Sequence, residues 1–260
     1  MIGALRVARI AGVEIFLDWS LLIIFILVTV SLGGGLFPQW HPEWNAATTW
    51  LTAAAAAVLL LVSVLLHELS HAIVGRAQGA QIKRITLFVF GGMAHIEQEP
   101  KVWRAEFWMA IVGPFVSLGL GTAFIFLGSL GVAGDAFAAE DPEALLRELS
   151  PLQTLLLWLG PVNIVLAIFN IIPAFPLDGG RVLRAILWGT TGDLTRATRW
   201  ASQGGQAFAW VLIAAGISMV LGLQVPVLGT GAASGLWIAL IGWFLHNAAV
   251  MSYRQQRVQE

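Results

Sequence analysis

Two histidines and one glutamate form the group of residues in this sequence that is best suited to chemistry. His67, Glu68 and His71 follow the pattern H-E-x-x-H inside an apolar run from Trp50 to Val74. Residues four positions apart lie on one face of a helix, so both imidazoles can reach one metal ion. Glu68 lies on a neighbouring face of the same helix, where it can take a proton from a metal-bound water without being a ligand. The pattern therefore predicts a zinc site with its own general base.

The alternative interpretation of the pattern is a pair of histidines that are hydrogen-bonded inside a helix bundle. Ionisable side chains are costly in hydrocarbon, however, and a cluster of them in an apolar segment indicates a functional site. The apolar setting therefore favours a metal site. Because the sequence contains no cysteine, nitrogen and oxygen atoms must supply all of the ligands.

The composition is that of a polytopic membrane protein. Hydrophobic residues make up 58% of the 260 residues and charged residues 11%, and the mean hydropathy is +0.80. Soluble domains contain about 25% charged residues. The net charge of -1 does not indicate nucleic acid as a partner, and we expect none. We also expect no signal peptide, because residues 1–18 lack an apolar core followed by a cleavage site of small residues.

The predicted fold is an all-α membrane domain over residues 1–260 with one small β element. Transmembrane helices are expected at residues 17–32, 46–78, 105–130, 151–172, 201–223 and 235–252. In residues 5–17 the side chains alternate loosely between two faces, a pattern that predicts one or two short strands. The pattern in residues 82–98 predicts a β-hairpin. This hairpin is too short to cross a bilayer. Because backbone at membrane depth must be buried in protein or line a wet cavity, we expect a re-entrant element beside the metal.

The basic residues define the expected topology. With six helices and a cytosolic N-terminus, 13 of the 14 lysines and arginines lie on the cytosolic side of the plasma membrane, and only Arg147 lies opposite. The second and fourth helices then both run inward, so that the metal motif and Asp178 reach the same depth. A helix rises about 25 Å from Trp50 to His67, against about 30 Å for the hydrocarbon core. The site is therefore expected within the bilayer, near its cytosolic face.

Asp178 is the strongest candidate for the third protein ligand that a catalytic zinc needs beside its open position. Pro173 and Pro176 break the helix in front of it, and Gly179 and Gly180 let the backbone approach another element. The candidate glutamates lie in loops, at the edges of helices or in the tail, and lack such a setting. The alternative is that this stretch only forms the turn into an interfacial helix.

These motifs resemble those of the site-2 protease family of intramembrane zinc metalloproteases. The matches follow the same order over essentially the whole chain, and they are H-E-L-S-H at 67–71, Phe90-Gly91-Gly92, Gly113-Pro114, and N-x-x-P-x-x-P-L-D-G-G from Asn170 to Gly180. The resemblance implies one zinc ion per chain, held by His67, His71 and Asp178, with Glu68 as general base or acid. It also implies that Asn170 lies by the site, where its amide could steady the substrate carbonyl or its oxyanion.

Two departures from the family pattern concern additional domains. Many relatives carry an inserted PDZ domain and others a C-terminal pair of CBS domains, but no such composition is present here. The chain stops at Glu260 after a tail that is similar to the start of a linker. We therefore expect a membrane core, with any CBS pair absent or trimmed.

The resemblance implies an endopeptidase that cleaves a bond in or near the transmembrane helix of a single-span protein in regulated intramembrane proteolysis. An anti-sigma factor or a membrane-bound transcription regulator would be such a substrate. We expect the segment from Ile85 to Ile96 to receive the substrate as an added strand, with Phe90, Gly91 and Gly92 among the substrate-binding residues. A membrane transporter or metal sensor is the alternative, although transporters usually show internal repeats and do not need a base that is not a ligand. An inactive scaffold is disfavoured because every chemical position is intact.

Overall fold

The computed structural model describes residues 4–89, 91–98, 100–132, 146–226 and 229–258. The chain folds into two compact units. The first unit consists of Met1–Glu99 and Val112–Ile168, and the second of Pro100–Ile111 and Phe169–Glu260. Two helices, α4 (Trp103–Ser129) and α6 (Pro151–Ile171), contribute residues to both units.

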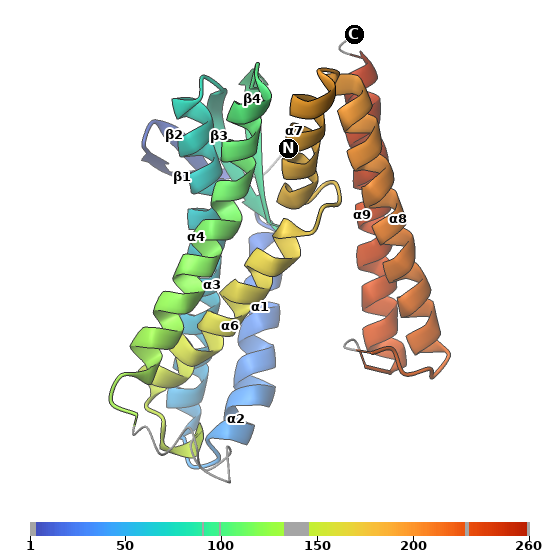
Figure 1. Ribbon diagram of the computed structural model, residues 1–260. Helices are drawn as coiled ribbons and strands as arrows, with labels where there is room; N and C mark the ends of the chain where they lie inside the picture. The colour runs from blue at the N-terminus through green and yellow to red at the C-terminus, as the bar shows by residue number, and fades with distance from the viewer. Residues whose placement is uncertain (1–3, 90, 99, 133–145, 227–228, 259–260) are drawn as a thin grey trace. The chain divides into compact units, whose positions relative to one another are not determined.

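Six helices in the described residues are long and apolar enough to cross a membrane (Figure 1). They are Leu21–Trp40, Ala46–Ala77, Trp103–Ser129, Pro151–Ile171, Leu194–Val220 and Ala232–Met251. A small four-stranded sheet accompanies them. The predicted fold class, a helical membrane protein with a small β element, is therefore confirmed.

The first apolar helix is displaced from its predicted bounds. Helix α1 (Leu21–Ser31) continues through a π-helical segment, η1 (Leu32–Leu36), into α2 (Phe37–Trp40), where a loop from residue 33 was expected. The Gly33-Gly34-Gly35 run does not end the helix, because backbone groups in an apolar surrounding must be paired within their own segment. Gly33 also packs against α3, since a Cβ there would lie 2.6 Å from Trp50 Cε3.

Helix α3 (Ala46–Ala77) carries the H-E-x-x-H motif in the first unit. It begins at Asn45, whose side chain accepts a hydrogen bond from the Thr48 amide at 2.9 Å, as expected of an N-cap. Its alanines allow α1, α2 and α6 to pack closely against it. The resulting buried cluster contains Leu32, Phe37, Ala53, Ala56, Leu155 and Leu159. This packing fixes the helix that carries the two histidines.

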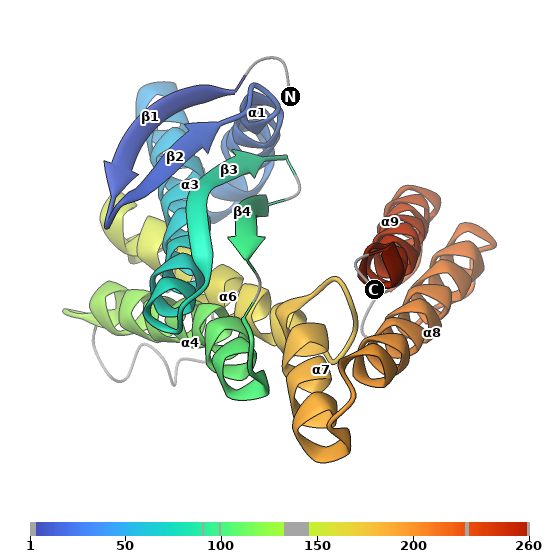
Figure 2. The ribbon, with the colours of Figure 1, turned by 90° about the horizontal axis from the view of Figure 1, so that it is seen from above.

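The four strands form one mixed sheet in the order β1-β2-β3-β4 (Figure 2). They are β1 (Leu5–Ile10), β2 (Val13–Leu17), β3 (Gln81–Phe88) and β4 (Gly91–Gln98). The two predicted β segments are both present as antiparallel pairs. They are joined by parallel pairing of β2 with β3, which the sequence analysis did not predict. Strand β4 is therefore at an edge of the sheet, whereas β3 is an interior strand.

The second unit contains α7 (Asp178–Thr191), α8 (Leu194–Val220) and α9 (Ala232–Val258). Helix α8 begins seven residues before the predicted residue 201, because the Asp193 side chain accepts a hydrogen bond from the Arg196 amide at 3.0 Å and caps it. Helices α8 and α9 run antiparallel and approach closely at glycines (Figure 1). A Cβ on Gly216 would lie 2.5 Å from the Gly235 carbonyl oxygen.

A buried ion pair joins α7 to the first turns of α4 within the second unit. The Arg184 side chain donates from Nε to Glu106 Oε1 at 2.6 Å and also contacts this oxygen through Nη2. Arg181 lies 4.0 Å from the same oxygen. Glu106 is 1% exposed and Arg184 is 6% exposed. The pair therefore holds α7, which begins with Asp178, against α4.

We predict that Arg184→Met lowers the free energy of unfolding by about 3–5 kcal/mol, because it leaves a buried carboxylate without its nearest partner. The measurement is thermal unfolding of the purified protein in detergent. The double variant Glu106→Met/Arg184→Met should recover most of the loss, since an apolar replacement of both partners leaves no buried charge. An unchanged unfolding temperature in Arg184→Met would show that the pair does not stabilise the fold.

Candidate metal centre

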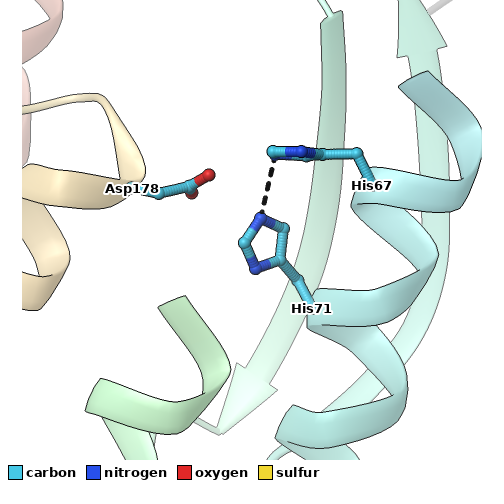
Figure 3. A group of neighbouring side chains, drawn as sticks. All are labelled: His67, His71 and Asp178. Carbon is cyan, nitrogen blue, oxygen red and sulfur yellow. Dashed lines mark hydrogen bonds between the residues drawn. The ribbon is translucent and has the colours of Figure 1, made fainter. Parts of the chain in front are cut away.

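His67 and His71 lie on successive turns of α3 and turn their imidazoles toward each other (Figure 3). Their Nε2 atoms are 3.2 Å apart, and the ring planes are nearly perpendicular, at 81°. Two nitrogens bound to one tetrahedral zinc ion at about 2.0–2.1 Å are about 3.3 Å apart. Both side chains are buried, with 4% and 8% exposure. The pair therefore has the spacing that a shared metal ion requires.

Helix α4 supplies the surface that faces these two imidazoles in the first unit. A Cβ on Gly113 would overlap the His71 ring and would lie 2.8 Å from His67 Nε2. One turn further along, Ser117 Oγ lies 2.9 Å from His67 Nδ1. The sequence analysis included Gly113 in a motif but did not single out Ser117. The spacing of four residues from Gly113, which puts both on one helix face, is the signal that could have found it.

Glu68 lies between the two histidines in sequence and is half-buried. Its side chain packs against the backbone of β4, because a Cβ on Gly92 would overlap Glu68 Cγ and would lie 3.0 Å from Oε1. Gly91 opens β4 opposite Phe88 with φ +125°, a conformation that favours glycine. Phe90, the third residue of the predicted substrate site, lies outside the described residues. The edge strand β4 is thus next to the side chain predicted to act as the base.

Asp178 is the first residue of α7 in the second unit, and its side chain is half-buried. A carboxylate is favourable at this position, because the N-terminus of a helix carries a partial positive charge. The space that a Cβ on Gly179 would fill is occupied by the carbonyl oxygens of Ile171 and Ile172, so the turn before α7 packs tightly onto its first turn. Asn170 is half-buried in the last turn of α6 and belongs to the same unit.

The polar residues that the sequence analysis did not assign to the site have other surroundings. His95 Nε2 lies 3.2 Å from Arg84 Nη2 at the sheet, and His246 packs edge-on against Trp210. Asn163 is fully buried and donates to the Leu159 carbonyl oxygen at 2.9 Å and to Ser63 Oγ at 3.4 Å. Asn163 therefore contributes to helix packing in the first unit.

Comparison with known proteins finds a matching peptidase family and several named relatives. The family model described as peptidase family M50 matches residues 55–149 and 142–212. The Synechocystis protein sll0528 is 38% identical over 257 residues, which are 98% of this chain and 61% of that protein. The Mycobacterium tuberculosis protein Rip3 is 39% identical over 249 residues, 96% of this chain and 58% of that protein. The names of both relatives include zinc metalloprotease, and this chain spans about three fifths of their length.

A solved structure shares the fold over nearly the whole chain. The solved structure of a site-2 protease from Methanocaldococcus jannaschii superposes with a TM-score of 0.58 at 25% sequence identity. The match covers 96% of this chain and 95% of the other. The arrangement of helices and sheet is therefore one that a site-2 protease also adopts.

We predict that Gly113→Ala strongly lowers the zinc content of the purified protein, because its methyl group would occupy the space between the two imidazoles. Zinc per chain is measured by elemental analysis. Gly119→Ala is the matched control on the same helix, since a Cβ there meets nothing within 4 Å. Equal zinc content in the two variants would contradict the assignment of this space to the metal.

Proposed function

Since this chain belongs to peptidase family M50, we propose that it is a zinc-dependent intramembrane endopeptidase of the site-2 protease type. It would cleave a peptide bond in or near the transmembrane helix of a membrane-protein substrate. The observation that carries this proposal is the pair of buried histidine nitrogens 3.2 Å apart, with a carboxylate on the adjacent residue.

His67, His71 and Asp178 are the proposed metal ligands. Two imidazole nitrogens and a carboxylate oxygen form a donor set that zinc prefers, and these three side chains would supply it (Figure 3). Three protein ligands leave one position open, which is the arrangement of catalytic rather than structural zinc sites. Bound there, one zinc ion per chain would supply Lewis-acid activation of a water molecule and of the peptide carbonyl.

Glu68 would move the proton in this reaction. Its carboxylate accepts a proton from the attacking water as the water oxygen bonds to the carbonyl carbon. It then donates this proton to the amide nitrogen as the C–N bond breaks, which leaves one new carboxyl end and one new amine end. The amide of Asn170 would donate a hydrogen bond to the negative charge that develops on the carbonyl oxygen.

Strand β4 is the proposed binding site for the substrate backbone. A peptide bond inside a helix must be unwound before it can be attacked, and unwinding exposes backbone groups that are costly to leave unpaired in an apolar surrounding. Among the described residues β4 is the last strand of the sheet, so its outer edge would offer backbone partners, and Gly92 of this strand lies against the Glu68 side chain. Binding by strand addition gives backbone affinity with little demand on sequence. Gly91, the first residue of β4, would form the start of this strand site, and Phe90 stays a predicted member of it from the sequence.

The proposed substrates are single-span membrane proteins, such as anti-sigma factors or membrane-bound transcription regulators, cleaved in regulated intramembrane proteolysis. Recognition through the backbone supports this class of substrate. It would select a transmembrane helix by how easily the helix unwinds, and not by the identity of particular side chains. The proposed location is the plasma membrane, with six spans, cytosolic termini and the active site within the bilayer near its cytosolic face. The distribution of basic residues supports this topology.

The metal assignment predicts different results for ligands and base. The purified protein should contain about one zinc per chain, and His67→Ala and Asp178→Ala should lose most of it. Glu68→Gln should keep the zinc and lose cleavage by about 10²–10⁴-fold, since the amide cannot accept the proton. Full zinc occupancy in Asp178→Ala would remove this residue from the ligand set, and zinc loss in Glu68→Gln would mean that the glutamate binds the metal.

The proposed topology predicts the accessibility of single cysteines, which can be placed freely because the chain has none. Glu43→Cys, between α2 and α3, should react with a membrane-impermeant thiol reagent applied to intact cells. Gln78→Cys, at the end of α3, should react only after the cells are opened. The opposite pattern would reverse the orientation and contradict the proposed depth of the site.

Strand addition at β4 predicts that proline substitutions there block cleavage while zinc remains bound. Met93→Pro and Ala94→Pro test two successive positions, one of which must remove an N–H from the outer edge. Val7→Pro and Ala8→Pro in β1, at the opposite edge of the sheet, are the matched controls. The assay is cleavage of a substrate whose helix is weakened by glycine. Normal cleavage by both β4 variants would exclude this edge as the binding site.

A further inference from the structure

The two ring nitrogens of His67 have different partners. Nε2 faces His71 Nε2 at 3.2 Å, whereas Nδ1 lies 2.9 Å from Ser117 Oγ. A neutral imidazole carries one proton, so one nitrogen donates while the other offers a lone pair. Metal binding through Nε2 requires the proton to be on Nδ1. The Ser117 hydroxyl oxygen is then in position to accept a hydrogen bond from it.

Because this contact is buried, it affects which tautomer His67 adopts. His67 is 4% exposed and Ser117 is fully buried, so bulk water has little access to Nδ1. A buried N–H without an acceptor is costly, and the alternative tautomer would place the proton on the nitrogen that has to bind the metal. The acceptor at Ser117 therefore favours the tautomer that leaves the Nε2 lone pair free for a ligand bond.

The hydroxyl of Ser117 also differs from those of the other serines in α3 and α4 in its hydrogen-bond partner. A serine in an apolar helix usually bonds to a backbone carbonyl of the preceding turn. Ser63 donates to the Leu59 carbonyl oxygen at 2.9 Å, Ser70 to that of His67 at 2.6 Å, and Ser129 to that of Phe126 at 2.9 Å. The contact of Ser117 is instead with a side-chain nitrogen on a different helix.

Gly113 places this hydroxyl in register with the imidazoles. It lies one turn before Ser117 on the same face of α4, and its missing side chain lets the helix backbone approach the two Nε2 atoms. One face of α4 thus provides space on the Nε2 side of His67 and an acceptor on its Nδ1 side.

From this geometry we infer that Ser117 is a positioning residue for the metal centre. Its hydroxyl holds His67 in the Nδ1–H tautomer and fixes the direction of the ring, so that Nε2 points at the metal. This inference rests on the proposed function, because it assumes that His67 is a ligand. Ser117 itself touches neither the metal nor the substrate.

The test compares the zinc affinity of purified variants by competition with a chelator. Ser117→Ala should bind zinc about 10–100-fold more weakly than the parent protein, the usual effect of removing a partner of a ligating histidine. Ser63→Ala is the matched control, because it removes another buried serine hydroxyl from the same unit without removing a contact to an imidazole nitrogen. It should keep the parent affinity.

A second pair of variants separates the hydroxyl from packing. Ser117→Thr and Ser117→Val have the same shape, so any cost of the added methyl group is common to both. The threonine variant should bind zinc more tightly than the valine variant, by a factor similar to that between the parent and Ser117→Ala. In the cobalt-substituted protein, the visible absorption of the threonine variant should resemble that of the parent, and that of the valine variant should be shifted.

Equal zinc affinities and equal cobalt spectra for the threonine and valine variants would overturn the inference. His67→Ala distinguishes this failure from that of the metal centre itself. If His67→Ala loses zinc while both Ser117 variants bind it equally, only the role of Ser117 is wrong. If His67→Ala binds zinc as the parent does, His67 is not a ligand, and the role of Ser117 is overturned along with the metal centre.

Discussion

The structure depends on the cost of placing imidazoles and carboxylates in an apolar, helical surrounding. His67 and His71 are buried in a helix that has the length and composition of a membrane span. Such groups persist there only when each polar atom has a partner. The two Nε2 atoms are 3.2 Å apart, and under the proposed function one metal ion would be the partner that both nitrogens share.

The elements around the histidines are shaped by the same requirement. Gly113 has no side chain that would fill the space at the two Nε2 atoms, and Gly92 has none that would overlap the Glu68 side chain. In the second unit, the tight turn before α7 places Asp178 at the positive end of a helix, and the buried Glu106–Arg184 pair fixes that helix. Within each unit, small residues or paired charges thus accommodate polar groups among apolar helices.

Local sequence patterns were sufficient to predict much of this arrangement. The H-E-x-x-H spacing fixes two side chains on one helix face whatever surrounds them, and the alternation in residues 5–17 and 82–98 indicates strands. Other features depend on partners distant in sequence. The parallel pairing of β2 with β3 joins residues about 70 apart, and the contact of Ser117 with His67 joins residues 50 apart. The helix also continues through Gly33-Gly34-Gly35, because its surroundings outweigh the low helix propensity of glycine.

X-ray absorption at the zinc edge of the loaded protein tests the central claim most directly. The account predicts two imidazole nitrogens at about 2.0–2.1 Å, with the remaining ligands being oxygens at about 2.0–2.2 Å. Two imidazoles correspond to His67 and His71, and the oxygens to Asp178 and the open position. A shell with a single imidazole, or with three, would contradict the proposed ligand set.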